Sequence, residues 1–589
     1  MAGLAGLARS DGRLRASRGR ALADAWQPVI SLAGRPSAEP GPTRKLAPQV
    51  ALVLGLVLAA AAVRWPAVHL VPPYTDETEE ALRAWAIARG ELLPLTNVDA
   101  YVGALWAYVV AAAFKALGRQ AETPRLVALA AGALTTGLTY LLARELFAAR
   151  GMAAASKTGL VAAILLGGNA AHILVNSHVA WSSCAAPLFT TAAFWLLVRG
   201  AAGPGLALAG AGLLFGLALQ THPSVATLLP AALAYGLWRD HGLVVRRATW
   251  VAAALFLVGY GNMLLYNVQT GLDSLRQAQR VGSEYAEGAG LDGLAYVSSV
   301  AGFIVLFGQV VGGAAAARPT ALAYLADPMV VVSTGLAVAS IPLAAREGQP
   351  LPLLTVVSAL ALLPPLNQRW APILEARYLM PLLPLVVAAM AGLLTRVPSP
   401  KLRRGTACRA STSFSPGLIV AVVLAGAQLA ALGGYYRDEI ASGRSNEGAR
   451  RMIAWVAEQR RPREPFVAHR ELHLLPTGGG GTWAKGLDFL LQFSGIRRDL
   501  ELPEPGAHLR ACDIRSVELR YVQRDSRSAV GTDPREPAYP AYWVARPSHD
   551  EPSAAEPSGT VALTAPYSLP FRPHSLFDER VPTFDTGCE

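Results

Sequence analysis

Two adjacent carboxylates, Asp76 and Glu77, are the most conspicuous candidates for chemistry in the first half of the chain. They belong to the charged run DETEE (76–80), which follows the apolar stretch VALVLGLVLAAAAV (50–63). A carboxylate that is held in a fixed place can accept a proton as a general base. A structural role is the alternative, with Asp76 as a helix N-cap and Glu79 completing a capping box. The two interpretations are compatible, because a capped Asp is also held still.

Other motifs of reactive residue types give no support for a metal or nucleotide site. HRELH (469–473) places two histidines around a glutamate but lacks the HExxH order of zinc proteases. GGGG (478–481) lacks the GK[ST] ending of a phosphate-binding loop and reads as a turn. The four cysteines show no CxxC spacing, so neither a disulfide framework nor a metal ligand set is predicted.

The composition predicts that these residues are carried by a membrane-spanning helical protein. The 589 residues are 52% hydrophobic and only 16% charged, against about a quarter charged in soluble proteins. Apolar runs close to the ~20 residues of a transmembrane helix recur along the chain. The segments of alternating polarity that mark a β-barrel are absent from the sequence, so we expect a mostly α polytopic bundle of about 11–13 spans. The runs are 50–63, 124–143, 158–175, 185–198, 203–219, 223–238, 249–265, 328–345, 351–366, 378–395 and 416–434.

The net charge of +11 is explained by membrane topology and does not indicate nucleic-acid binding. Arg and Lys cluster beside apolar segments, as they do in cytoplasmic loops, and form no single basic face interleaved with aromatics. The basic segment 1–47 is expected to be a poorly ordered cytoplasmic tail, and 48–65 a retained signal anchor. The DETEE run then lies outside, in a first external loop spanning 66–123.

Alternation of the basic loops requires two apolar segments not to cross the membrane. YVGALWAYVVAAAFKALG (101–118) is short, aromatic and contains Lys115, so we expect it to lie along the outer interface. The segment 297–317 must also cross incompletely, unless one of the assigned spans is wrong. Under this scheme, five polar segments gather on the outer face: 66–123, 176–184, 220–224, 267–296 and 367–377.

The composition changes at about residue 437, where long apolar runs give way to charges, prolines and turn formers. We therefore divide the chain into a membrane module at 48–436 and a small extracytoplasmic α/β domain at 437–589. In this domain, ARRMIAWVAEQR (449–460) predicts an amphipathic helix, and the two segments EPFVAH (464–469) and AYWVAR (541–546) predict strands. Past about 550 the Pro- and Ser-rich sequence predicts loose structure.

The membrane module resembles the C-type glycosyltransferases, particularly the protein O-mannosyltransferases and the lipid A aminoarabinose transferases. The shared pattern is Asp76-Glu77 after the first transmembrane helix, a juxtamembrane helix at 78–90, the segment 101–118, and a Gly118 to Arg125-Leu126 stretch. The likeness covers roughly 50–395. It continues through TYLLARELF (139–147), NAAHILVNSHVAW (169–181), LLFGLALQTHPS (213–224), YNVQTG (266–271) and ARYLMPLLP (376–384).

The resemblance implies transfer of a sugar, mannose or a related one, from a polyprenyl-phosphate donor. The acceptor would be a protein or a cell-envelope glycan or lipid on the outer face of the plasma (inner) membrane. An attacking hydroxyl must lose its proton, so one carboxylate base suffices because the lipid phosphate leaves as an anion. On this reading the reaction inverts the anomeric centre, Asp76 is the general base, and Glu77 positions Asp76 or the acceptor. No cofactor is required, and a divalent metal has no support in the sequence.

The same resemblance implies cationic partners for the phosphate. We expect Arg125, His222 and Arg377 to hold the donor phosphate, and Asp99 and Tyr101 to contact the acceptor. The alternatives are that the two arginines are snorkelling anchors at helix ends and that the histidine only starts a helix.

Two other function classes remain as alternatives. A transporter or flippase of lipid-linked substrates would place charged residues inside the spans and break helices in matching halves. The predicted spans are nearly free of charge, and this favours chemistry at a membrane surface. A non-catalytic envelope scaffold with a C-terminal binding domain leaves the acidic first loop unexplained.

Overall fold

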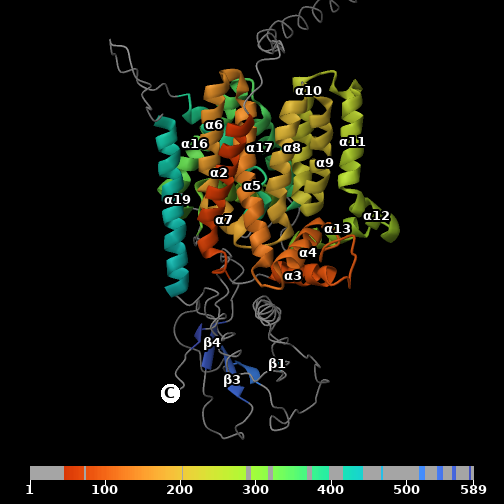
Figure 1. Ribbon diagram of the computed structural model, residues 1–589, viewed down its shortest axis with the longest axis vertical. Helices are drawn as coiled ribbons and strands as arrows, with labels where there is room; N and C mark the ends of the chain where they lie inside the picture. The colour runs from red at the N-terminus through yellow and green to blue at the C-terminus, as the bar shows by residue number, and fades with distance from the viewer. Residues whose placement is uncertain are drawn as a thin grey trace, which may run out of the picture.

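The protein folds into a bundle of helices followed by a small sheet (Figure 1). The computed structural model describes residues 46–71, 75–201, 203–286, 293–315, 323–324, 326–367, 370, 375–396 and 416–441, and five short strands. The α-helices of the bundle are α2 (Leu46–Arg64), α3 (Thr75–Ala88), α4 (Leu105–Leu117), α5 (Thr123–Leu146), α6 (Met152–Gly167), α7 (Ala170–Ser177), α8 (Ala186–Ala201), α9 (Gly205–Thr221), α10 (Leu229–Arg239), α11 (Arg247–Gly259), α12 (Gly261–Thr270), α13 (Asp273–Ala286), α14 (Gly293–Gly312), α16 (Pro328–Arg346), α17 (Leu351–Leu366), α18 (Leu383–Leu394) and α19 (Pro416–Ala441). Short 3-10 turns connect them: η1 (Trp65–Ala67), η2 (Ala148–Arg150), η3 (Ser182–Ala185), η4 (Pro223–Leu228), η5 (Leu243–Val245) and η6 (Glu375–Tyr378).

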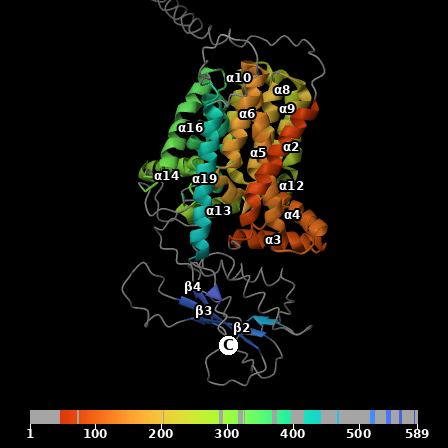
Figure 2. The same ribbon diagram turned by 60° about the vertical axis from the view of Figure 1, so that its left-hand side comes forward.

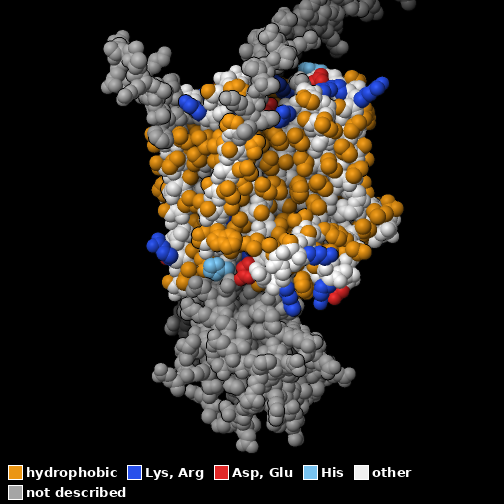
Figure 3. Space-filling model, in the orientation of Figure 1, with side chains coloured by type: hydrophobic (Ala, Val, Ile, Leu, Met, Phe, Trp, Pro, Cys, Tyr) orange, Lys and Arg blue, Asp and Glu red, His pale blue; other side chains and the backbone are white. Residues whose placement is uncertain are grey.

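The helices confirm a polytopic membrane fold. Within the described residues, five helices are long and apolar enough to cross a membrane, or up to seven if each bent helix pair is one span. Further apolar helices of 10–17 residues, α9, α17 and α18 among them, lie in the same bundle. Hydrophobic side chains cover the middle of the face in Figure 3, and charged ones gather at its two ends. The expected total of 11–13 spans stays a prediction, because several of the apolar segments form helices of only 10–17 residues.

Glycines allow two neighbouring helices, α9 and α11, to pack backbone against backbone. A Cβ atom on Gly212 would lie 2.0 Å from the carbonyl oxygen of Ala252, and one on Gly216 would lie 2.2 Å from that of Phe256. Small residues at a spacing of four along one face are the usual means of close helix packing in a membrane.

The helix that begins at Met152 is broken near its middle, and the break is tied to α14. α6 and α7 meet at an angle of 64°. Asn169 caps α7, with its Oδ1 accepting from the backbone nitrogen of His172 at 2.8 Å, and its Nδ2 donates to the carbonyl of Val310 at 2.9 Å. At the other end of α14, Ser299 donates to the carbonyl of Asn367 at 2.9 Å. The C-terminal end of α14 therefore contacts the break between α6 and α7, and the expectation that 297–317 crosses incompletely stays a prediction.

α3 and α4 lie together at one end of the bundle, which we call the α3 end (Figures 1 and 2). Trp85 of α3 meets Phe114 of α4 edge-on, with ring centroids 5.5 Å apart. Trp106 of α4 donates to the carbonyl of Ala180 at 3.1 Å. With 13 residues, α4 is only about 20 Å long. The expectation that juxtamembrane helices follow the first span is therefore confirmed.

The last residue of α2, Arg64, is completely buried at the α3 end. Its Nε donates to Ser177 Oγ at 3.1 Å, Nη1 donates to the carbonyl of Ala60 at 2.8 Å, and Nη2 lies 3.1 Å from His172 Nδ1. The backbone carbonyl of Arg64 lies 2.7 Å from His178 Nε2. These contacts fix the end of α2 to α7.

Basic residues from separate loops meet at the opposite end of the bundle. Glu347, after α16, forms ion pairs with both Arg150 and Arg396. Arg150 also donates to the carbonyl of Gly392 at 2.8 Å and stacks over Phe147 at 4.4 Å. Arg150 and Arg396 belong to basic clusters far apart in the sequence, and the structure brings them to one end of the bundle.

The C-terminal part contains a five-stranded sheet with the order β1-β2-β3-β4-β5. The strands are β1 (Phe466–Ala468), β2 (Val517–Gln523), β3 (Pro540–Pro547), β4 (Thr560–Thr564) and β5 (Thr583–Phe584). β1 pairs parallel with β2, and the other pairs are antiparallel.

Two strands expected from the sequence are present in this sheet, as β1 and β3. β4 and β5 lie beyond residue 550, where the sequence predicts loose structure; the run TVALT (560–564) pairs with β3 despite its Pro- and Ser-rich surroundings. The expected helix at 449–460 and residues 1–45 of the expected tail at 1–47 lie outside the described residues, and the last two residues of that tail belong to α2.

Candidate active site

The acidic helix α3 carries four carboxylates, of which one is exposed, one is partly exposed and two are buried. The helix begins at Thr75, so Asp76 lies in its first turn and the expected N-cap position with a capping box is wrong. A negative charge in the first turn is still favourable, because it faces the positive end of the helix dipole. The Asp76 side chain is half exposed, whereas Glu77 and Glu80 are buried.

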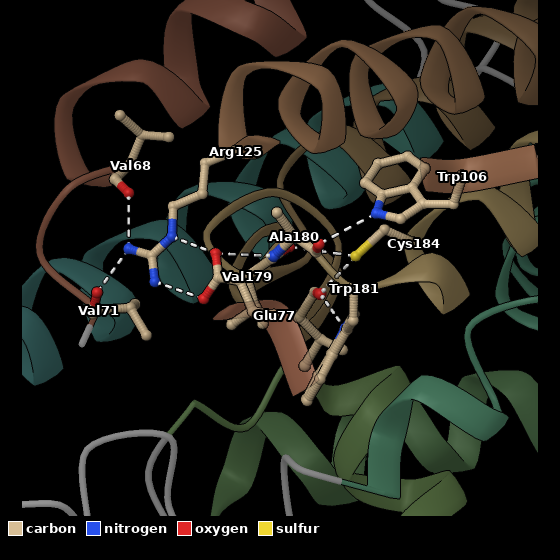
Figure 4. A network of polar contacts seen from close by, with 10 residues as sticks. Val68, Val71, Glu77, Trp106, Arg125, Val179, Ala180, Trp181 and Cys184 are labelled. Atoms are coloured by element: carbon tan, nitrogen blue, oxygen red, sulfur yellow. Dashed lines mark hydrogen bonds and ion pairs between the residues drawn. The ribbon is translucent and has the colours of Figure 1, made fainter. Parts of the chain in front are cut away.

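Glu77 forms a buried, bidentate ion pair with Arg125 at the start of α5 (Figure 4). Its two carboxylate oxygens accept from Arg125 Nε at 2.6 Å and Nη2 at 2.8 Å, and one of them also accepts from the backbone nitrogen of Ala180 at 3.1 Å. Arg125 Nη1 donates to the carbonyls of Val68 and Val71. The pair joins α3, α5, the segment after α2 and the loop after α7.

Glu80, one helical turn further on, binds the same loop. Its carboxylate accepts from the backbone nitrogen of Ser182 at 2.7 Å and from Ser182 Oγ at 2.9 Å. Burial raises the pKa of Glu80 from 4.5 to about 8, and the negative charge of Asp76 adds to the shift, while the bonds from Ser182 oppose it. Glu80 therefore carries a proton at neutral pH.

The exposed carboxylate, Asp76, meets a guanidinium that comes from about 300 residues later in the chain. Arg377 of η6 donates from Nη1 to Asp76 Oδ2 at 3.1 Å. The same guanidinium lies 4.6 Å from the centre of the Trp181 ring and 5.3 Å from that of Tyr378. Its Nε is 4.0 Å from Glu375 Oε2. Arg377 is largely buried, with 16% of its side chain exposed, yet it reaches a group that is open to solvent.

His222 lies beside this arginine through Tyr378. The His222 and Tyr378 rings are 5.0 Å apart between centroids. His222 Nδ1 accepts from the backbone nitrogen of Ser224 at 3.2 Å. Burial, followed by the positive charge of Arg377, lowers the pKa of His222 to about 3. The imidazole is therefore neutral and, with Nδ1 an acceptor, its proton resides on Nε2.

Asp99 and Tyr101 lie in the loop between α3 and α4. Tyr101 Oη donates to Asp99 Oδ2 at 3.1 Å. Burial raises the pKa of Asp99, the Tyr101 hydrogen bond lowers it, and the charges of Asp76 and Glu79 raise it further. Between the two residues, the backbone nitrogen of Ala100 donates to Gln277 of α13. The loop thus faces the acidic end of α3.

The structure brings the residues expected from the sequence into three contacts: Asp76 with Arg377, Glu77 with Arg125, and Asp99 with Tyr101. The phosphate-binding role of Arg125 stays a prediction, since its donors face protein oxygens here. Glu80, Trp181 and Tyr378 were missed. Glu80 had a signal in DETEE, and Tyr378 is adjacent to Arg377, but Trp181 carries no local pattern that marks it.

No group of three or more His, Cys, Asp or Glu among the described residues is arranged to hold a metal ion. The segment HRELH (469–473) lies outside those residues.

No family model matches the chain, and no curated protein matches it. Among solved structures, it is similar to ArnT from Cupriavidus metallidurans, both bound to undecaprenyl phosphate (16% identity, 75% of this chain and 84% of that chain, TM-score 0.45) and in the apo state (14%, 76% and 85%, TM-score 0.48). It is also similar to an oligosaccharyltransferase of Archaeoglobus fulgidus (14%, 65% and 56%, TM-score 0.39) and to the S. cerevisiae protein O-mannosyltransferase Pmt1-Pmt2 complex (19%, 38% and 34%, TM-score 0.29).

Proposed function

We propose that the protein is an integral-membrane glycosyltransferase that uses a polyprenyl-phosphate sugar as its donor. The acceptor is a hydroxyl group of a protein or of a cell-envelope glycan or lipid, and the sugar is mannose or a related one. The observation that carries the proposal is the contact of Asp76 with Arg377 at 3.1 Å. A half-exposed base and a largely buried cation stand side by side at the end of an apolar bundle, at the level where a lipid phosphate would lie.

Asp76 and Arg377 match the two charges that develop in the reaction, the proton lost by the acceptor and the negative charge on the leaving phosphate. The acceptor oxygen attacks the anomeric carbon from the face opposite the phosphate, its proton passes to the Asp76 carboxylate, and the bond from the anomeric carbon to the phosphate oxygen breaks. The lipid phosphate leaves with the bonding electrons as an anion, and Arg377 stabilises that charge. The product has inverted configuration. This step needs no cofactor.

The Asp76–Arg377 pair is weak enough for Arg377 to exchange Asp76 for the donor phosphate. With half of the Asp76 side chain exposed, the pair is a surface ion pair, whose worth is about 0–1 kcal/mol. The donor phosphate is a diester with a single negative charge, and it competes well for a guanidinium because its two free oxygens accept two parallel hydrogen bonds. Arrival of the donor would therefore turn Arg377 to the phosphate and release Asp76 for the acceptor proton.

The other candidates take supporting places in the proposal. His222 supplies a neutral N–H beside Tyr378 for the donor phosphate. Arg125 fixes Glu77 and through it the start of α3, next to Asp76. Asp99 and Tyr101 border the acceptor side.

The extracytoplasmic face of the plasma (inner) membrane is our proposed location of the site. Support comes from the opposite end of the bundle, where Arg150 and Arg396 gather around Glu347. Clusters of arginine beside transmembrane helices are typical of the cytoplasmic side. The α3 end would then face outwards, together with the C-terminal domain.

A flippase or transporter of lipid-linked substrates is the second candidate. The bent pairs α6–α7, at 64°, and α11–α12, at 60°, favour it, because transporters often bind substrate at broken helices. The chemistry-bearing residues, however, lie at the α3 end and not along a path through the bundle, which favours transfer at the surface.

The test compares the wild type with Asp76→Asn in transfer from radiolabelled polyprenyl-phosphate sugars to a cell-envelope extract. We expect a loss of about 10²–10⁴ in rate, the usual contribution of a general base. Glu91→Gln is the matched control. Glu91 is an exposed carboxylate, and among the described residues its ion pair is with nearby Arg89. A wild-type rate in the inserted Asp76→Asn protein would refute the base assignment. A wild type that moves such lipids across liposomes without transferring sugar would favour the flippase.

A further inference from the structure

Two carboxylates of α3, one turn apart, hold the loop between α7 and η3 on both sides of Trp181. Glu77 accepts from the backbone nitrogen of Ala180 at 3.1 Å. Glu80 accepts from the backbone nitrogen and hydroxyl of Ser182 at 2.7 and 2.9 Å. The backbone of the intervening residue, Trp181, is therefore fixed relative to α3.

The indole ring of Trp181 is fixed as well. It is 1% exposed, and its Nε1 donates to the carbonyl of Val175 at 3.3 Å. The Arg377 guanidinium carbon lies 4.6 Å from the centre of this ring, within the range of a cation–π contact. A cation on a buried indole is held more strongly than a cation in an exposed ion pair. Trp181, more than Asp76, therefore determines where Arg377 stays.

The remaining contacts of Arg377 leave it free to change partner at Nη1. Tyr378 and Glu375 contact it from its own turn: Tyr378 Oη lies 3.4 Å from Nη2, the Tyr378 ring centre lies 5.3 Å from the guanidinium carbon, and Glu375 Oε2 lies 4.0 Å from Nε. The Nη1 group points at Asp76, whose carboxylate is half exposed. An arginine whose plane rests on an aromatic ring can exchange one hydrogen-bond acceptor for another without leaving the ring.

We propose that Trp181 is a positioning residue: its ring, clamped in place by Glu77 and Glu80, is a platform that holds Arg377 between Asp76 and the donor phosphate. This inference rests on the proposed function, and it assigns Trp181 an effect on phosphate affinity although Trp181 does not touch the donor. Arg377 carries the contact to phosphate, and Trp181 acts through it.

The test measures binding of polyprenyl phosphate without sugar to the purified protein. Trp181→Leu should weaken binding about 5–30-fold, the range expected for loss of a cation–π contact, and Trp181→Phe, which keeps an aromatic face, should weaken it less. The matched control is Trp195→Leu. Trp195 also makes a cation–π contact, with the Arg199 guanidinium carbon 5.3 Å from its ring centre, but it lies on α8, away from the site. It should bind like the wild type.

A double-mutant cycle separates positioning from general packing. In the background of Arg377→Gln, Trp181→Leu should have no further effect on binding, because its route to the phosphate has been removed. Independent, multiplying effects of the two substitutions would overturn the proposal, as would wild-type binding by Trp181→Leu. If Trp181→Leu does not insert, Glu80→Ala and its conservative counterpart Glu80→Gln replace it. Loss of binding in the first and rescue in the second supports the platform, whereas equal binding by both refutes it.

The same measurement distinguishes this inference from the function on which it rests. A wild type that binds no polyprenyl phosphate would overturn the proposed function and the platform together. A wild type that binds it, with Trp181→Leu binding equally well, would overturn the platform alone.

Discussion

Removal of Arg125 tests the idea that a buried ion pair sets the position of α3. Arg125→Met keeps the length of the side chain but removes its charge and all of its donors. Glu77 then loses two charge-assisted hydrogen bonds, of 2.6 and 2.8 Å, and the carbonyls of Val68 and Val71 lose their shared donor. Glu77 is 2% exposed and Arg125 is 4% exposed, so water does not replace these bonds.

The magnitude follows from this burial. Breaking a buried pair while one charge stays behind costs about 3–5 kcal/mol in the free energy of unfolding. Glu77→Met, which leaves the guanidinium unpaired, should cost a similar amount. The double variant leaves no buried charge, so its cost should be well below the sum of the two single costs. Asp76→Asn is the comparison, since it removes only the charge of the half-exposed partner and leaves Arg377 on Trp181 and Tyr378, so it should cost only about 0–1 kcal/mol.

The assay is the free energy of unfolding in mixed micelles, measured by titration with a denaturing detergent for the wild type, both single variants and the double variant. Costs of less than 1 kcal/mol for the single variants would refute the claim that the pair anchors α3. Strict additivity in the double variant would refute the claim that the two residues act on each other.

Two further predictions concern stability. Burial raises the pKa of Glu80 from 4.5 to about 8. Between these pH values the folded protein holds a proton that the unfolded chain releases. The free energy of unfolding should therefore fall as pH rises from about 4.5 to 8, by up to about 1.4 kcal/mol per pH unit. Glu80→Gln should flatten this dependence, and an unchanged slope between pH 5 and 8 in unfolding titrations would contradict it. Gly216→Ala should destabilise the protein by about 1–3 kcal/mol, because its Cβ atom would lie 2.2 Å from the carbonyl oxygen of Phe256. Gly426→Ala in α19 meets no atom within 4 Å and should be neutral in the same titrations, and equal effects of the two substitutions would show that close packing is not the cause.

The class of fold was readable from the sequence because lipid imposes a strong local rule. A helix must satisfy its own backbone groups and be apolar over about 20 residues, so each span leaves a mark in one continuous segment. The same rule explains why α4 was recognised as too short and too aromatic to cross. The break at Asn169 was not foreseen, because the polar partner that stabilises it, the carbonyl of Val310, lies in another helix.

The candidate site was only partly predictable for a related reason. Asp76 stands out because charge is rare so close to an apolar run, but the role of its neighbours depends on contacts between distant segments. Glu77 was expected to position Asp76 or the acceptor, and its partner Arg125 lies 48 positions away. Glu80 meets Ser182 across 102 positions, and Trp181 meets Arg377 through ring geometry. Single-sequence patterns contain no record of such pairings.

The contacts of Arg64 have a consequence for biosynthesis. This residue ends the first described helix, and its side-chain partners, His172 and Ser177, follow 108 and 113 positions later. At a synthesis rate of about 5–20 residues per second, the ribosome needs about 5–23 s to deliver them. During that interval the guanidinium must find water or lipid phosphate at the membrane surface, and its position at the very end of α2 allows this. In the proposed orientation, the end of α2 would hold this charge at the outer membrane surface until α7 is made, and the contacts with His172 and Ser177 would then bury it.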